Sequence, residues 1–257
     1  MRSPVDFKPA PRLRELPKLK DGTAHLWLLD LDLVSDPPGY IRDMLSTEDL
    51  QRAARFRHIE SQRRFLLCRA WLRRLLAAYT TLPLREIQFQ LNPYGKPELT
   101  GQRVRFNLAH SEKMAAIAFS LDHPVGVDIE FTRNVHDLDG IASRFFSRTE
   151  NAILARCNAD EKETAFFRTW SCKESVIKAD GRGLSLSTGE VEVLAGPVTV
   201  TELCQVKAEN GQNMTWALHP FTPGPRGFGC LALRPDCIEI CAWFATRNHL
   251  DNNFTIP

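Results

Sequence analysis

An aromatic, an acidic and a basic residue follow one another at helical spacing in the second half of this sequence. Trp170, Glu174 and Lys178 are four residues apart, so on a helix they share one face. An aromatic, an acidic and a basic side chain in one row make a poor stripe for a buried core. The ordinary alternative is a surface Glu–Lys pair, which stabilises a helix by only about 0.2–0.5 kcal/mol.

A second acidic block, Gly126-Val127-Asp128-Ile129-Glu130, precedes this row by about forty residues. Residues two apart in a strand point to the same face, so we expect Asp128 and Glu130 to project together while Val127 and Ile129 enter the core. Two carboxylates this close repel each other unless a cation lies between them. With Glu174 as a third oxygen ligand, the set favours Mg²⁺. Taken alone, Asp-x-Glu is equally typical of a strand end with two solvated acids.

Basic side chains accompany both blocks. Residues 42–74 hold nine arginines against four acids, and Lys96 lies in the turn Asn92-Pro93-Tyr94-Gly95-Lys96-Pro97. A metal with open positions beside Lys178, Lys96 and His110 predicts a pyrophosphate site and attack on phosphorus. These residues alone do not separate a nuclease from a nucleotidyl transferase or another phosphoryl-group transferase. The arginine-rich run has three possible interpretations: a solvated helix face, a nucleic-acid-binding surface or a binding site for a phosphorylated small molecule.

Two alternatives therefore stay open at this point, a nucleic-acid-binding protein and a Mg²⁺-dependent nuclease that uses the three carboxylates. No RNP, helix-turn-helix or zinc-finger signature accompanies the arginines. Residues 1–123 carry a net charge of +6 and residues 124–257 a net charge of −4. An acidic second half disfavours a long track for nucleic-acid phosphates.

The order and spacing of five blocks resemble those of the 4′-phosphopantetheinyl transferases, in particular the long, surfactin-synthetase-activating class. The combination of Trp-x-x-Lys-Glu-x-x-x-Lys with the earlier Gly-x-Asp-x-Glu is the most specific part, and clear matches cover residues 46–186. Ala109 and Ser175 depart from the usual residues, but both are small. The five blocks are Asn92–Pro97, Phe106–Ser111, Gly126–Glu130, Arg144–Ser147 and Trp170–Leu184.

The resemblance implies a magnesium-dependent enzyme that takes coenzyme A as its co-substrate. It would transfer the 4′-phosphopantetheine arm to a serine of an apo acyl or peptidyl carrier protein and release adenosine 3′,5′-bisphosphate. Mg²⁺ would be held by Asp128, Glu130 and Glu174. Glu174 would also serve as the base or water-orienting group, and Lys178 would neutralise the leaving phosphate. The coenzyme-binding positions implied are Arg52, Arg64, Lys96, His110, Ser111 and Lys178.

The fold implied is α+β, a pseudo-dimer of two similar α/β halves with the active site in the cleft between them. We place the N-terminal, basic, coenzyme-phosphate half at residues 1–123 and the C-terminal, acidic, metal-binding half at residues 124–257. Each half then repeats the order strand, helices, strands, and Phe65…Trp71 loosely echoes Phe166…Trp170. Such a pseudo-dimer is expected to act as a monomer.

Local patterns predict the elements that must position these residues. Helices are expected from a cap at Ser46, from about residue 60 to 79, from a cap at Ser147, and from about residue 161 to 179. For the last helix, Asp160 and Glu163 have capping spacing and Gly181 suits a left-handed C-cap. Strands are expected over 25–33, 87–91, 104–108, 114–120 and 125–129, and alternation dominates 190–246. The first twenty residues are expected to form an extended arm.

Composition predicts an ordinary globular protein. Hydrophobic residues make up 43% and charged residues 25% of 257 residues. No early secretory signal or membrane-length apolar run is evident, and seven cysteines without paired Cys-x-x-Cys spacing suggest reduced, mostly buried thiols in the cytoplasm.

The carrier protein is expected to dock on an apolar surface with a basic rim. Carriers of this type are acidic helical bundles, as the resemblance implies. We expect their docking surface near Phe145 and Phe146, with Arg148 and Arg156 as its rim, although at least one phenylalanine should belong to the core. Which fatty-acid, polyketide or peptide synthase supplies the carrier does not follow from the sequence.

Overall fold

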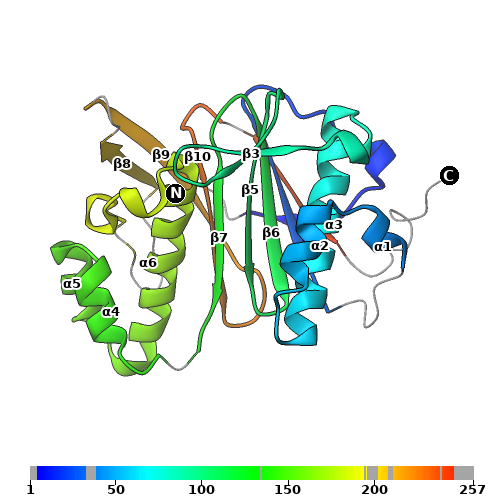
Figure 1. Cartoon of the computed structure of the whole chain (residues 1–257). Coiled ribbons are helices and arrows are strands. Elements are labelled where there is room, and N and C mark those ends of the chain that lie inside the picture. The colour runs from blue at the N-terminus through cyan, green and yellow to red at the C-terminus, as the bar shows by residue number, and fades with distance from the viewer. Residues whose placement is uncertain are drawn as a thin grey trace.

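The computed structural model describes residues 5–32, 39–133, 135–193, 195, 202–207, 211–237 and 239–245. Within these residues two β-sheets lie face to face between two long helices, α3 (Ile59–Thr80) and α6 (Ala159–Asp180) (Figure 1). The order across the molecule is helix, sheet, sheet, helix. This mixed α+β architecture confirms the predicted fold class at that level.

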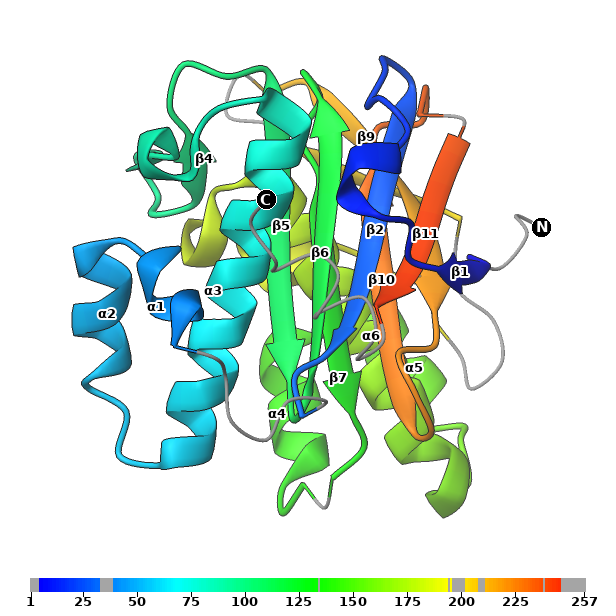
Figure 2. The ribbon, with the colours of Figure 1, turned by 90° about the vertical axis from the view of Figure 1, so that its right-hand side faces the viewer.

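The first sheet has five strands in the order β1-β11-β2-β6-β5. Strand β11 pairs in parallel with both of its neighbours, and the other pairs are antiparallel (Figure 2). A strand from the end of the chain is therefore held between two from its beginning. The bounds are β1 Phe7–Pro9, β11 Glu239–Ala245, β2 Thr23–Asp30, β6 Met114–Leu121 and β5 Val104–Ser111.

The second sheet has four antiparallel strands in the order β7-β10-β9-β8. A two-stranded ribbon, β3 with β4, flanks the turn at residues 92–97. The bounds are β7 Gly126–Phe131, β10 Gly227–Leu233, β9 Asn213–Phe221, β8 Leu203–Lys207, β3 Phe89–Leu91 and β4 Pro97–Leu99.

The remaining helices are short. Ser46 caps α2 and Ser147 caps α5 through reciprocal capping boxes, as the sequence predicted. The bounds are α1 Tyr40–Asp43, α2 Thr47–Ala53, α4 Leu138–Phe145 and α5 Arg148–Leu154. Single 3₁₀ turns cover Leu13–Glu15, Leu84–Glu86, Gly183–Ser185 and Thr188–Glu190.

The alternation of side chains along the strands divides the core into layers. Val127 and Ile129 of β7 pack between the two sheets with Leu26 of β2 and Leu231 of β10. The opposite face of the first sheet packs on α3, and the opposite face of the second packs on α6. Asp128, on the other side of β7 from Val127, therefore faces α6. This orientation confirms the predicted alternation of the acidic strand.

Several predicted elements differ from the structure. The arm at the N-terminus is not merely extended, because Phe7–Pro9 pairs with β11. Residues 109–111 continue β5 instead of following it, since β6 supplies ladder partners as far as Ser111. The helix α4 was missed. Leu33, the predicted end of the first strand, lies outside the described residues.

Candidate active site

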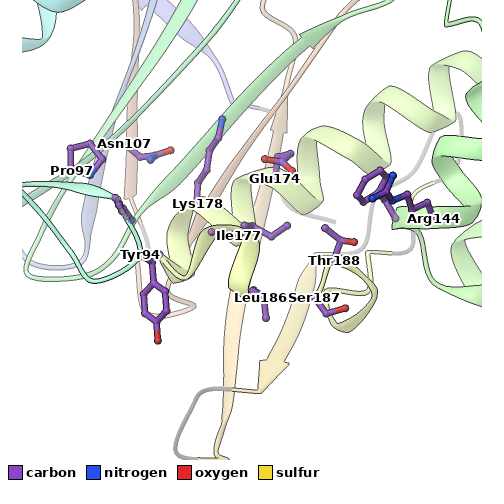
Figure 3. A pocket seen from close by; sticks show the side chains of 15 residues that line it. Tyr94, Pro97, Asn107, Arg144, Glu174, Ile177, Lys178, Leu186, Ser187 and Thr188 are labelled. Atoms are coloured by element: carbon purple, nitrogen blue, oxygen red, sulfur yellow. The ribbon is translucent and has the colours of Figure 1, made fainter. Parts of the chain in front are cut away.

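Helix α6 carries Glu174 and Lys178. It begins earlier than predicted because Asn158, with Glu161, forms the capping box, so the assignment of Asp160 and Glu163 as the capping pair is wrong. Gly181 ends the helix in the left-handed conformation with φ 89°, as predicted. Glu174 and Lys178 lie on the side of α6 that borders a cavity (Figure 3).

Gly126 brings β7 into close contact with α6. A Cβ atom at this position would lie 2.0 Å from the carbonyl oxygen of Ser175 and 2.4 Å from the backbone nitrogen of Ala179. Only glycine permits this approach, because both contacts are to backbone atoms that cannot rotate away. The acidic residues of β7 are thereby held directly under the functional face of α6.

Asp128 and Lys178 form an ion pair across this contact. Lys178 Nζ lies 2.6 Å from Asp128 Oδ1. Asp128 is 5% exposed, and its second carboxylate oxygen, Oδ2, has no hydrogen-bond partner among the described residues. Burial raises the pKa of Asp128 to about 7 although Lys178 opposes the rise, and the nearby charges of Glu130 and Glu174 add to it. This carboxylate therefore lacks the positive charge that would keep it fully ionised.

Glu130 and Glu174 complete the acidic group. Glu130 Oε2 accepts hydrogen bonds from Ser111 Oγ at 3.3 Å and from Arg133 Nη1 at 3.0 Å. Burial raises the pKa of Glu174, and repulsion by Glu130 adds to this, against the opposing effect of Lys178. The structure thus brings the three predicted metal ligands into one electrostatic group. Within the described ranges, however, no three His, Cys, Asp or Glu residues are arranged closely enough to hold a metal ion.

The donor set nonetheless fits a magnesium ion. Asp128 Oδ2 is a buried oxygen donor without a hydrogen-bond partner among the described residues, and burial raises the pKa of Asp128 and of Glu174, so a nearby cation would favour the ionised form of both. Lys178 supplies the only cationic partner that the structure gives to Asp128 within the part of the chain it describes.

Lys96 docks the turn 92–97 onto the end of α6. Its Nζ donates to the carbonyl oxygens of Val125 at 3.2 Å and Ala179 at 3.3 Å. Asn92 Nδ2 donates to the carbonyl oxygen of Gly181 at 3.0 Å. Burial lowers the pKa of Lys96 to about 8. Lys96, predicted to bind the coenzyme, is thus also a structural link, and its bond to Ala179 satisfies one of the last carbonyls of α6, which lack intrahelical donors.

His110 and Ser111 lie at the end of β5. Ser111 is buried against Glu130, as described above, whereas His110 is exposed at the rim. Partial desolvation lowers the pKa of His110, and the positive charges of Lys178 and Arg52 lower it further. The two cations lie on different helices, Arg52 on α2 and Lys178 on α6.

Arg64 and Arg52 lie on the side of the first sheet. Arg64 makes a two-pronged contact with Asp32, at 2.8 Å from Nε and 2.7 Å from Nη2, and Nη1 donates to the carbonyl oxygen of Glu112 at 3.1 Å. Arg52 is exposed, and its guanidinium group lies 5.5 Å from the centre of the Phe65 ring. A phosphate at Arg64 would have to compete with Asp32 for the guanidinium group.

A cavity of about 510 Å³ opens beside Glu174 and Lys178. Tyr94 and Pro97 of the turn lie on one side of it and Arg144 on the other (Figure 3). Ile177 of α6 and Leu186 also line it, so the cavity wall combines charged and apolar side chains. An elongated molecule with a charged group and an apolar arm suits this combination.

Comparisons with known proteins agree with this arrangement. The family model "4′-phosphopantetheinyl transferase superfamily" matches residues 124–218, and "4′-phosphopantetheinyl transferase, N-terminal" matches residues 39–122. The chain is 34% identical over 207 residues to the 4′-phosphopantetheinyl transferase HetI of Nostoc sp., covering 77% of this chain and 82% of that protein. The chain belongs to the 4′-phosphopantetheinyl transferase superfamily.

Other members of this superfamily are similar over shorter stretches. The chain is 35% identical over 159 residues to the 4′-phosphopantetheinyl transferase Sfp of Bacillus subtilis, covering 62% of this chain and 70% of that protein. It is 30% identical over 165 residues to an L-aminoadipate-semialdehyde dehydrogenase-phosphopantetheinyl transferase of Xenopus laevis, with 60% of this chain and 55% of that protein covered. The chain is accordingly an enzyme of the 4′-phosphopantetheinyl transferase type.

Two residues of the family blocks have roles that the sequence did not reveal. Lys173 is buried, and its Nζ lies 2.9 and 2.7 Å from the two carboxylate oxygens of Glu150 and also donates to the carbonyl oxygen of Val191. Asn107 Oδ1 accepts the backbone N–H of Val127 at 2.8 Å. Lys173 therefore holds α5 to α6, and Asn107 links the two sheets next to Asp128. The capping position of Glu150 was the only feature of the sequence that could have pointed to the pair with Lys173. No feature of the sequence pointed to the role of Asn107.

The docking surface predicted near α5 has a smaller apolar part than expected. Phe146 is 6% and Leu154 is 2% exposed, because both pack against Phe166 in a separate core cluster. At least one phenylalanine was expected in the core, and Phe146 is there. Arg148 and Arg156 are exposed, but no exposed large hydrophobic residue accompanies them in the described part of α5.

The arginine-rich run is also not simply a solvated face. Arg63 is bound to Asp32 at 2.8 Å and to Glu60 at 2.7 Å, and Arg69 to Asp49 at 2.7 Å. Arg73 is buried and donates to the carbonyl oxygen of Met44 at 2.8 Å. These arginines fasten α2 and the adjoining loops to α3.

Five of the seven cysteines are buried and all seven are free thiols. No helix among the described residues is long and apolar enough to cross a membrane.

Proposed function

We propose that this enzyme transfers the 4′-phosphopantetheine group of coenzyme A to a serine of an apo acyl or peptidyl carrier protein, with adenosine 3′,5′-bisphosphate as the second product. The proposal rests chiefly on the buried Asp128, whose carboxylate is only half partnered, beside Lys178 and Glu174 at the mouth of a cavity. Family membership supports the same reaction.

Mg²⁺ is the cofactor that the acidic group suits. Asp128, Glu130 and Glu174 would supply hard oxygen ligands, and Asp128 Oδ2 is buried without a hydrogen-bond partner among the described residues. When bound, the ion would neutralise charge on the pyrophosphate and on the leaving group. We propose the active site as the cleft between two halves, residues 1–123 and 124–257, of a monomeric pseudo-dimer.

Different side chains of this enzyme would have different roles in the transfer. The serine oxygen forms a bond to the β-phosphorus of coenzyme A while the bond from that phosphorus to the bridging oxygen breaks. Glu174 accepts the serine proton, and the raised pKa of Glu174 makes it a better base than an exposed carboxylate. Lys178 donates to the departing phosphate in place of Asp128.

The remaining predicted residues would bind the coenzyme. His110 and Ser111 lie at the end of β5 on the pyrophosphate side, and Lys96 borders the cavity from the docked turn. Arg64, with Arg52, would bind the 3′-phosphate. Arg64 would then give up its ion pair with Asp32 and contact the ligand instead. No nucleic acid is needed in this scheme. The nuclease and nucleic-acid alternatives lose support because three of the arginines are committed to internal contacts.

Intact-mass spectrometry of an apo carrier protein tests the proposal. With coenzyme A and MgCl₂ the carrier should gain the mass of one phosphopantetheine group, and adenosine 3′,5′-bisphosphate should appear in equal amount. Chelation with EDTA should stop the reaction, and Glu174→Gln should slow it by about 10²–10³ while leaving the thermal unfolding midpoint unchanged. Wild-type rates in Glu174→Gln would exclude the assigned role.

A further inference from the structure

An exposed apolar and basic corner lies where α2 meets α3. Phe56 is 38% and Ile59 is 72% exposed, which places them among the few large hydrophobic side chains that the described residues leave in solvent. Phe56 lies in the short connection between the helices, and Ile59 is the first residue of α3. Ile59 occupies the first turn of α3 but contributes nothing to the core beneath it.

Arginines surround these two side chains. Arg52, Arg55 and Arg57 are all exposed, and neither Arg55 nor Arg57 forms an ion pair with any described residue. The nearest acids along the chain are already occupied, since Asp49 binds Arg69 and Glu60 binds Arg63. The corner is therefore positively charged without internal compensation.

The corner is continuous with the active site. The Phe56 ring lies 5.3 Å from the Phe65 ring, and Arg52 lies over Phe65 at 5.5 Å. Arg52 and Lys178 both act on His110. Figure 2 shows α3 beginning at the same end of the first sheet at which β5 ends, with α2 beside α3. His110 belongs to the end of β5, and Arg64 of α3 donates to the carbonyl oxygen of Glu112 just beyond that strand.

We propose that this corner, formed by Phe56, Ile59, Arg55 and Arg57, docks an acidic, helical carrier protein so that its acceptor serine reaches Glu174. This proposal rests on the proposed function. An apolar centre with a basic rim fits the apolar and acidic face of a carrier helix. It fits a nucleic acid poorly, because Ile59 offers no hydrogen bond or stacking face and Asp128, Glu130 and Glu174 would repel a phosphate chain.

Charge and shape are tested separately. The variants Arg55→Glu/Arg57→Glu and Ile59→Glu should each raise KM for the apo carrier about tenfold or more, with KM for coenzyme A and kcat within about twofold of wild type. The salt dependence of the carrier KM should weaken in the arginine variant. Arg148→Glu/Arg156→Glu on α5 and Leu203→Glu on β8 are the matched controls and should leave the carrier KM unchanged.

Carrier binding is also measured without turnover. Fluorescence anisotropy uses labelled acyl and peptidyl carrier domains whose acceptor serine is alanine, together with a single-stranded oligonucleotide. Loss of carrier binding in both corner variants supports the docking surface, whether or not transfer is detected. If the wild type binds the carrier but transfers nothing, the proposed function fails and the docking surface stands. Wild-type carrier binding in both variants, or binding of the oligonucleotide but of neither carrier, overturns the proposal. Ile59→Ser replaces Ile59→Glu if the latter unfolds at lower temperature than wild type.

Discussion

Lys178 Nζ lies 2.6 Å from Asp128 Oδ1, so the cation of α6 pairs with one oxygen of the most deeply buried acid of β7. In Lys178→Met, Asp128 stays buried but loses its ion-pair partner. We expect the free energy of unfolding to fall by about 3 kcal/mol at pH 8. Transfer should fall about 10²-fold or more because the leaving phosphate loses a donor.

The double variant Asp128→Asn/Lys178→Met separates these two effects. It should recover most of the unfolding free energy in urea, since no unpaired charge remains, but it should recover none of the activity. A double variant as unstable as Lys178→Met would show that the lysine acts through packing instead of charge.

Adjacent residues of one block should differ in what they control. Lys173→Met removes the partner of Glu150 inside the protein and should destabilise the fold by about 3–5 kcal/mol. Glu174→Gln, one position on, should leave the urea midpoint within error and slow transfer by about 10²–10³. Unfolding curves and initial rates on the same preparations check this division, and equal stability loss in both variants would contradict it.

Gly126→Ala should separate β7 from α6. The added methyl group meets backbone atoms of Ser175 and Ala179, so the cost should reach about 3 kcal/mol, the upper end for overpacking. Activity should fall with it, because Asp128 follows Gly126 by two residues. Gly39→Ala, where nothing lies within 4 Å, is the control and should leave the thermal midpoint unchanged.

His25 should make stability depend on pH below neutrality. It is 1% exposed, its Nδ1 lies 2.9 Å from Tyr79 Oη, and burial lowers its pKa to about 4 from an ordinary 6.5. The unfolded chain then binds more protons between these values, so this contribution is complete above pH 6.5 and is lost as the pH falls toward 4. The slope from this one group is at most about 1.4 kcal/mol per pH unit.

Urea unfolding of His25→Gln measures this contribution. The variant should show a shallower loss of unfolding free energy between pH 6.5 and 4.5 than the wild type. His136→Gln changes an exposed histidine and should keep the wild-type slope. An unchanged slope in His25→Gln would assign the acid sensitivity to other groups.

Arg64→Ala should weaken coenzyme A more than 3′-dephospho-coenzyme A. A charge-assisted contact to the 3′-phosphate corresponds to roughly tenfold to a hundredfold in Kd. Asp32→Asn should have the opposite effect on coenzyme A, because it frees the guanidinium group from its ion pair. Calorimetric titration of both ligands decides the matter, and equal losses for both would make Arg64 a structural residue.

Local patterns in the sequence determined the elements that carry the chemistry. Helical spacing placed Glu174 and Lys178 on one face, and strand alternation turned Asp128 away from the core between the sheets. Ser46 and Ser147 cap the starts of their helices and Gly181 ends α6, as expected. These features depend on torsion angles and neighbours within a few residues, so a short stretch of sequence contains all that they require.

Tertiary structure decided which partners these side chains have. Lys96 joins carbonyls of Val125 and Ala179, Lys173 pairs with Glu150, and Arg64 pairs with Asp32. Phe146 became core while Phe56 stayed exposed, and β11 entered a sheet that begins with residues more than two hundred positions earlier. Such ion pairs, ladders and burial join residues distant in sequence, and their choice depends on how whole layers pack, which no local period encodes.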